Sequence, residues 1–374
     1  MNIAIDGLHA LVMLRALRTG RVSGGLPTQR VGLLPPDPSP RKRWTRTAID
    51  LGPFENLIAY DNGHPLLTAC PSKGSRIRMA GVTCAVLERG LPAKSFVPLV
   101  GGISIPCPEL LFLEMDRYMG PLPQLMLGLE LCGNFSRDPK EPLSGDARLH
   151  IAPATTAEKV RAYAAEAGLR GHDQSRLLAE CLADNAWSPG EALVAAWAAL
   201  PFTELGYGLG PIRLNERVEA EGDLSSFAAK GSRVPDILLA GTTIGINYDG
   251  EGHLDLDKIV SAASALGSSP GNSHMALELN QATEAVREKY VDDRRRDREL
   301  GAAGYTVFAA TKEDLYQEGA LERLMGQCLV ALRSAGIEGL EPQIRTISSK
   351  AVTRLRRSML DEVLPGRGHA GHLI

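Results

Sequence analysis

Three oxygen-bearing side chains stand at the ends of two short apolar runs in residues 234–253, VPDILLAGTTIGINYDGEGH. Asp236 opens the first run, and Asn247 and Asp249 close the second. Side chains of a strand alternate between its two faces, so Asn247 and Asp249 share a face. A turn at Gly241–Thr242 folds the second run back beside the first, which brings Asp236 next to both. Such oxygen ligands suit Mg²⁺ or Mn²⁺, so the sequence predicts a divalent metal site able to activate water and stabilise charge on a phosphate.

A simpler interpretation is that these are turn residues, since Asp and Asn are common beside hairpin loops. The charged helix expected over about 280–301 bears on the choice, because Asp293 and Asp297 fall on its apolar stripe. Acids on such a stripe face a polar site, or they pair with arginines three or four positions away on a solvated face. The sequence leaves both interpretations open.

Two further residues are candidates for the same chemistry. Glu191 follows Ser188 by three positions and Pro189 by two, which is the pattern of a capping box with proline at the first helical position. Capping alone explains Glu191 and needs no metal. His253 follows a glycine-rich turn, where a lone histidine is more often a surface residue than a catalyst.

The elements that must position these residues are expected from periodicity. Helical spacing covers residues 3–18, and short β-branched runs with glycine breaks make 76–107 β-rich. We expect helices over 108–119, 121–135, 156–184 and 187–202, and a buried strand over 304–311. Residues 348–365 form a basic helix near the end. The order of helices and strands predicts an α/β fold with a mixed sheet, after an α+β N-terminal domain.

Composition limits the class of protein. The chain has 374 residues, a net charge of −3 and 44% apolar residues, which is typical of a globular protein with two or three domains. The net charge gives no global attraction to nucleic acid. Six scattered cysteines without a C-x-x-C pair argue against a zinc knot and favour a reducing compartment. No signal peptide or membrane-length apolar run is evident, so we expect a cytoplasmic protein without membrane contact.

Taken together, SPGEALVAAW, VPDILL, NYDGEGH and DRRRDRELGAAGYTV resemble the very-short-patch-repair (Vsr-like) endonuclease branch of the PD-(D/E)xK phosphodiesterases. The resemblance covers about residues 187–316. It implies a restriction-endonuclease-like mixed sheet flanked by helices, Asp236 and Asp249 as metal-binding catalytic acids, and Glu191 as a supporting helix acid. It also implies that His253 lies near the site.

The sequence departs from that family at one ligand. The family's glutamate is Asn247 here, which can ligate through its carbonyl oxygen but brings no charge. The family's lysine is absent too, although this branch often has Asp at that place. The resemblance therefore implies a metal-dependent site, with Mg²⁺ or Mn²⁺, that Asn247 weakens.

A second resemblance covers about residues 78–133, which are similar to the middle domain of AbiEi-like antitoxin proteins. Those proteins often join this module to a Vsr-like C-terminal domain. No clear winged helix-turn-helix precedes the segment. The resemblance leaves any toxin partner, and the oligomeric state, unidentified.

These observations predict four segments: an AbiEi-like α+β domain over 1–150, a helical linker over 151–186, a Vsr-like nuclease domain over 187–335 and a basic tail over 336–374. The leading hypothesis is a metal-dependent DNA endonuclease that hydrolyses phosphodiester bonds. The alternatives are a non-catalytic nucleic-acid-binding or antitoxin-type regulator and a protein-interaction scaffold. Candidate phosphate contacts are Arg294, Arg295 and Arg298, with Lys350, Arg354, Arg356 and Arg357 in the tail.

Overall fold

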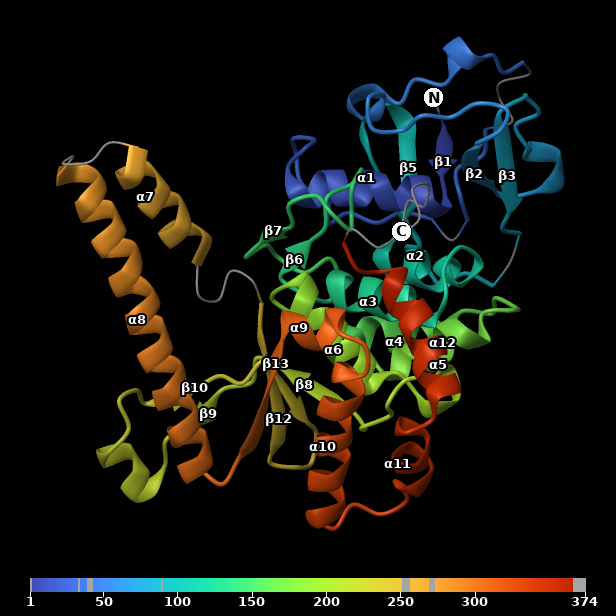
Figure 1. The fold of residues 1–374 in the computed structure, drawn as a ribbon. Helices are drawn as coiled ribbons and strands as arrows, with labels where there is room; N and C mark the ends of the chain where they lie inside the picture. The colour runs from blue at the N-terminus through green and yellow to red at the C-terminus, as the bar shows by residue number, and fades with distance from the viewer. Residues whose placement is uncertain are drawn as a thin grey trace. The chain divides into compact units, whose positions relative to one another are not determined.

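The chain folds into two compact α/β units. A computed structural model describes residues 2–32, 34–38, 43–88, 90–250, 256–268 and 273–365. Unit 1 comprises Met1–Gly208 together with Arg354–Ile374, and unit 2 comprises Leu209–Thr353 (Figure 1). The units divide after Gly208, whereas the sequence predicts that the second domain begins at residue 187. The segment from Arg354 onward belongs to unit 1. Short 3₁₀ helices occupy Arg46–Ala48, Gly52–Phe54, Lys73–Ser75, Val100–Gly102, Met115–Arg117, Phe202–Glu204 and Gly222–Ser226.

Unit 1 is built on a five-stranded mixed sheet with the order β3-β2-β1-β5-β4. In this sheet β1 is parallel to β5 and antiparallel to β2. The expected helix over 3–18 is wrong at its start, because Ile3–Ile5 form the buried central strand β1. Gly7, at φ +55°, is the first residue of the helix that follows this strand. The other strands are β2 (Leu66–Cys70), β3 (Val82–Val86), β4 (Phe96–Pro98) and β5 (Ile103–Pro106), with a separate pair β6 (Phe135–Ser136) and β7 (Arg148–Leu149).

Helices pack around one another and against this sheet in unit 1. Three of them begin with proline in their first turn, where the missing N–H costs nothing. Val160 and Leu178 are fully buried, and residues 151–186 belong to unit 1. The helices are α1 (Gly7–Thr19), α2 (Pro108–Glu114), α3 (Pro121–Leu131), α4 (Ala157–Glu166), α5 (Asp173–Glu180), α6 (Pro189–Ala199) and the greater part of α12 (Lys350–Asp361).

Unit 2 holds a four-stranded mixed sheet with the order β13-β12-β11-β8. Strands β8, β11 and β12 form an antiparallel meander, and β13 pairs in parallel with β12. A tight turn joins β11 to β12, with Gly241 at φ +76°. The strands are β8 (Ile212–Leu214), β11 (Ile237–Leu239), β12 (Ile244–Asp249) and β13 (Thr306–Thr311), and β9 (Val218–Glu219) pairs with β10 (Ser232–Arg233).

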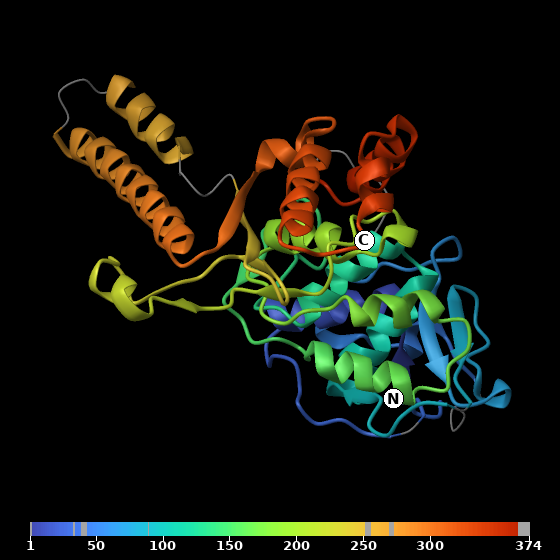
Figure 2. The same ribbon diagram turned by 90° about the horizontal axis from the view of Figure 1, so that it is seen from below.

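A long helical hairpin connects β12 to β13 in unit 2. Figures 1 and 2 show α7 (Leu256–Ser268) beside the first half of the 30-residue α8 (Ser273–Ala302). The second half of α8 is fixed by Arg233, which pairs with Asp292 at 2.9 Å and with Glu299 at 2.6 Å. The remaining helices are α9 (Lys312–Tyr316), α10 (Ala320–Ser334) and α11 (Glu341–Ile347). Among the described helices, none combines the length and apolar character needed to span a bilayer.

Candidate functional site

The polar residues of the β11–β12 hairpin form a row across the sheet of unit 2. Ile237 pairs with Ile246 in antiparallel register, so Asp236 lies opposite Asn247 and on the same face. Asp249 is two positions further along β12 and shares that face. On the other side of Asp236, its backbone C=O accepts from the N–H of Asn215 at 2.9 Å. The structure therefore has Asp236, Asn247 and Asp249 on one face, as the alternation predicts.

Hydrogen bonds hold the first two members of the row in place. The Oδ2 atom of Asp236 accepts from the backbone N–H of Tyr248 at 2.6 Å, so this carboxylate lies beside the backbone between Asn247 and Asp249. In return, Oδ1 of Asn247 accepts from the backbone N–H of Asp236 at 3.1 Å. Asn247 is only 2% exposed. Its carbonyl oxygen thus satisfies a backbone donor that the end of β11 would otherwise leave unpaired.

Asp249, at the end of the row, faces an arginine from α8. The Nη2 atom of Arg296 lies 3.9 Å from Oδ1 of Asp249 and 3.6 Å from Oδ1 of Asp293. The Arg296 side chain is 15% exposed, so it places a largely buried positive charge at the site. Arg296 was not predicted as a site residue, because it sits in a run of four basic residues interrupted only by Asp297.

The acids of α8 pair with basic groups, as the solvated-face interpretation proposed. Asp293 pairs with Arg296, and Asp297 pairs with Arg294 at 3.1 Å. Asp292 instead pairs with Lys230 and Arg233 across the unit. Among the described acids of α8, Asp293 both pairs with an arginine of the same helix and lies near the polar row, because its partner Arg296 also reaches Asp249.

Glu191 belongs to unit 1, at the first turn of α6. The Oγ of Ser188 accepts from the N–H of Glu191 at 3.2 Å, which confirms the N-cap. The Glu191 carboxylate accepts from the N–H of Trp187 at 3.2 Å, so it serves the same helix start. Its approach to Asp236 and Asp249 stays a prediction. His253 lies outside the described residues.

The candidate phosphate contacts differ in availability. Arg295 and Arg298 are exposed on α8, and neither forms an ion pair within the part of the chain that the structure describes. Arg294 is also exposed, but it pairs with Asp297 and lies 5.6 Å from the centre of the Tyr290 ring. Asp297 and Tyr290 therefore hold the Arg294 side chain in one direction.

The tail prediction is wrong for Arg356 and incomplete for Arg357. Arg356 is 2% exposed, donates to the C=O of Leu205 at 2.7 Å and lies 4.1 Å above the Tyr207 ring. It is a structural residue of unit 1, because the amphipathic α12 turns it inward. Arg357 pairs with Asp361 at 3.0 Å. Lys350 and Arg354 are exposed.

The ligand types of the row fit a hard divalent cation, but their number does not make a strong site. Two carboxylates and one amide oxygen are the groups that Mg²⁺ accepts alongside water. Within the described ranges, no cluster of three or more His, Cys, Asp or Glu side chains has the geometry of a metal site. The row therefore offers two carboxylates and one amide oxygen, too few charged ligands for a strong site.

Comparison with protein-family models, curated proteins and solved structures found no match to this chain.

Proposed function

We propose that unit 2 is a PD-(D/E)xK-type phosphodiesterase domain that acts on DNA with a divalent metal, at a site weakened by Asn247. One observation carries the proposal. The Asp236 carboxylate is hydrogen bonded to Tyr248 N–H, directly between Asn247 and Asp249 on the next strand. Asp236, Asn247 and Asp249 thus lie on one face where β12 ends beside the start of β11, and their order along the chain supports the Vsr-like resemblance.

For this function, the two carboxylates must lie close enough together to share one cation. Asp236 and Asp249 would hold the cation, which when bound lowers the pKa of water and stabilises negative charge on a phosphate. Asn247 contributes a dipole where the related enzymes have a full charge. The Arg296 guanidinium beside Asp249 supplies a positive charge that can meet a phosphate oxygen, a role that cations commonly have in phosphodiester hydrolysis.

The same contacts favour a second candidate function, a DNA-binding regulator without catalysis. The Asn247 oxygen is already used by Asp236 N–H, and Arg296 offsets the charge of Asp249. A site neutralised in this way has less need of a metal. The two candidates share DNA binding and differ only in metal-dependent cleavage.

The DNA-binding surface in both cases is the exposed basic face of α8. Arg295 and Arg298 are the two candidates there without ion pairs in the described ranges. The test is DNA binding by fluorescence anisotropy at several salt concentrations, with Arg298→Gln and with Arg345→Gln as the control from exposed α11. Arg298→Gln should weaken binding to all sequences and lower the slope of log K against log salt by about one. Arg345→Gln should change neither.

Cleavage of plasmid DNA with manganese then separates the two candidates. Parent activity that disappears with Asp236→Asn supports the phosphodiesterase. Salt-dependent binding without cleavage supports the regulator. An affinity that does not change with salt rejects both.

A further inference from the structure

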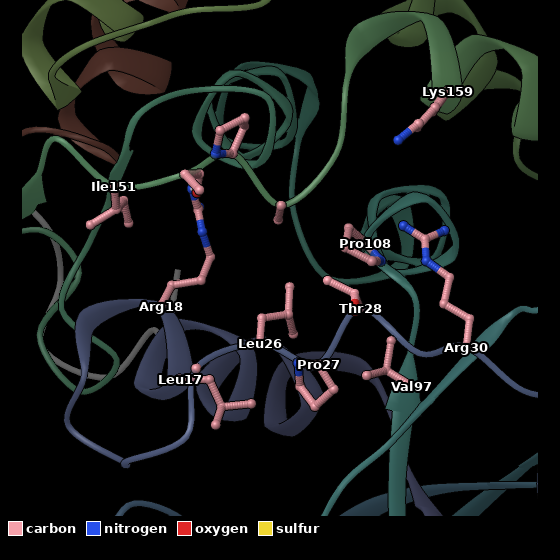
Figure 3. A pocket seen from close by; sticks show the side chains of 14 residues that line it. Leu17, Arg18, Leu26, Pro27, Thr28, Arg30, Val97, Pro108, Ile151 and Lys159 are labelled. Atoms are coloured by element: carbon pink, nitrogen blue, oxygen red, sulfur yellow. The ribbon is translucent and has the colours of Figure 1, made fainter.

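Unit 1 contains a cavity that the proposed function of unit 2 does not use. Its volume is about 540 Å³, within the range typical of small-molecule sites. It lies among the C-terminal end of α1, the following loop, β4, the start of α2, residues 151–154 and α4. Figure 3 shows the side chains of Arg18, Leu26 and Lys159 reaching toward the same space. All lining residues belong to unit 1.

The lining of this cavity has an unequal distribution of charge. Apolar side chains form most of the wall, including Leu17, Leu26, Pro27, Val97, Pro108 and Ile151. Among the described residues, three cationic ones complete it and no acidic residue lines it. A wall of this composition suits a ligand that has an apolar body and a negatively charged group.

Arg18 is the buried cation of the wall. It is 8% exposed, and its guanidinium donates to the C=O groups of Glu130, Gly133 and Ala152 at 2.9, 3.0 and 3.2 Å. Its Nε–H is buried and has no hydrogen-bond partner among the described residues, so Arg18 acts on the cavity through its charge. Carbonyl oxygens satisfy donors without neutralising the charge. Burial lowers the pKa of Arg18, which reflects the cost of holding that charge away from water.

The surrounding core does not supply the missing negative charge. Arg15 and Arg137 are both buried, and both pair with the fully buried Glu130 carboxylate at 2.9 Å. Glu130 also receives a second bond from Arg15 at 3.0 Å and one from Ser136. Three buried guanidinium groups thus share one carboxylate. A buried excess of positive charge is costly unless a counter-ion approaches it.

The other two cationic residues of the wall, Arg30 and Lys159, differ in whether an acid pairs with them. Arg30 forms a two-pronged ion pair with Glu109 at 2.7 and 3.0 Å, and Thr155 donates to the same carboxylate. The Arg30–Glu109 pair therefore carries no net charge. Lys159 is exposed and forms no ion pair within the described part of the chain. Its ammonium is therefore available to a ligand, on the opposite side of the cavity from Arg18 in Figure 3.

We propose that this cavity of unit 1 binds a small organic anion, a carboxylate or phosphate monoester with a compact apolar body. The anionic group takes the position between Arg18 and Lys159, and the body packs on Leu17, Leu26 and Val97. The site is independent of the proposed metal chemistry of unit 2.

The test is calorimetric titration of the full chain with octanoate, octyl phosphate and the neutral 1-octanol. We expect both anions to bind and 1-octanol to bind at least about tenfold more weakly, because the charge supplies more than 1.4 kcal/mol. Relative binding of the two anions shows whether a carboxylate or a phosphate is preferred. Added salt should weaken both.

Two variants connect the binding to the cavity. Lys159→Gln should weaken the anions about fivefold, the size of a partly exposed ion pair. Lys140→Gln, an exposed lysine of unit 1 outside the lining, should leave them unchanged. Leu26→Glu places a negative charge in the mouth and should abolish binding with the fold intact by circular dichroism. The proposal is overturned if 1-octanol binds as well as octanoate, if neither anion binds, or if Lys159→Gln and Leu26→Glu both bind like the parent.

Discussion

Replacing Asn247 with aspartate tests whether the polar row of unit 2 tolerates a second carboxylate opposite Asp236 without a bound metal. Asn247 is 2% exposed and lies directly opposite Asp236, where facing side chains have Cβ atoms about 5 Å apart. Two unit charges at about 5 Å repel by about 3 kcal/mol at an effective dielectric constant of about 20. The new carboxylate keeps the bond from Asp236 N–H and strengthens it by about 1 kcal/mol, because the acceptor is charged.

The net expectation is that Asn247→Asp lowers the free energy of unfolding by at least about 2 kcal/mol in EDTA at neutral pH, because burial of the new charge adds to the repulsion. For a unit of about 150 residues this lowers Tm by about 4 to 8 °C. Manganese should restore most of the loss, because a bound cation offsets the repulsion. The assay is thermal unfolding followed by circular dichroism, with EDTA and with manganese.

A matched variant separates charge repulsion from loss of packing. Asp236→Asn combined with Asn247→Asp leaves one carboxylate in the pair, so the repulsion vanishes and stability in EDTA should return toward the parent's. The reasoning is refuted if Asn247→Asp is as stable as the parent in EDTA. It is refuted equally if the double variant is no more stable than Asn247→Asp.

Other expected outcomes concern unit 1. Burial, and the nearby Asp6, raise the pKa of Glu114 well above its ordinary value of 4.5. Glu114 therefore stabilises the fold below about pH 4.5 and loses that contribution as pH rises through its folded pKa, so Glu114→Gln should flatten the pH dependence of chemical denaturation over this range. An unchanged dependence would show that Glu114 does not titrate with folding. Arg356→Ala should cost about 3 kcal/mol, because it leaves buried carbonyls unpaired, whereas the exposed Arg354→Ala should cost under about 0.5 kcal/mol. Equal urea midpoints for the two variants would contradict the buried role of Arg356.

The row of the β11–β12 hairpin could be predicted from the sequence because two simple rules determine it. Alternation puts Asn247 and Asp249 on one face, and a short turn at Gly241 sets the register that brings Asp236 opposite Asn247. The strand expected over 304–311 is present as β13, but only Ala310 in it is buried, so the expected burial was wrong.

Other features depend on contacts that no local pattern encodes. Several arginines of α8 have the same type and neighbouring positions, and the packing of α8 against β13 and β10 selects Arg296 to face Asp249. Ile3 and Ile5 fit a helical stripe as well as a strand, and pairing with β2 and β5 decides for the strand. The return of α12 to unit 1 depends on Arg356 reaching Leu205, a contact between residues 151 positions apart.

The most direct measurement for the central claim is calorimetric titration of manganese into the intact chain and into Asp236→Asn. This substitution keeps the shape of the side chain and removes one of the two charges that would hold the cation. The account predicts a weak single-site isotherm for the parent and none for Asp236→Asn, with circular dichroism spectra that superimpose. Identical isotherms for the two proteins, or no binding by either, would contradict a metal site at Asp236.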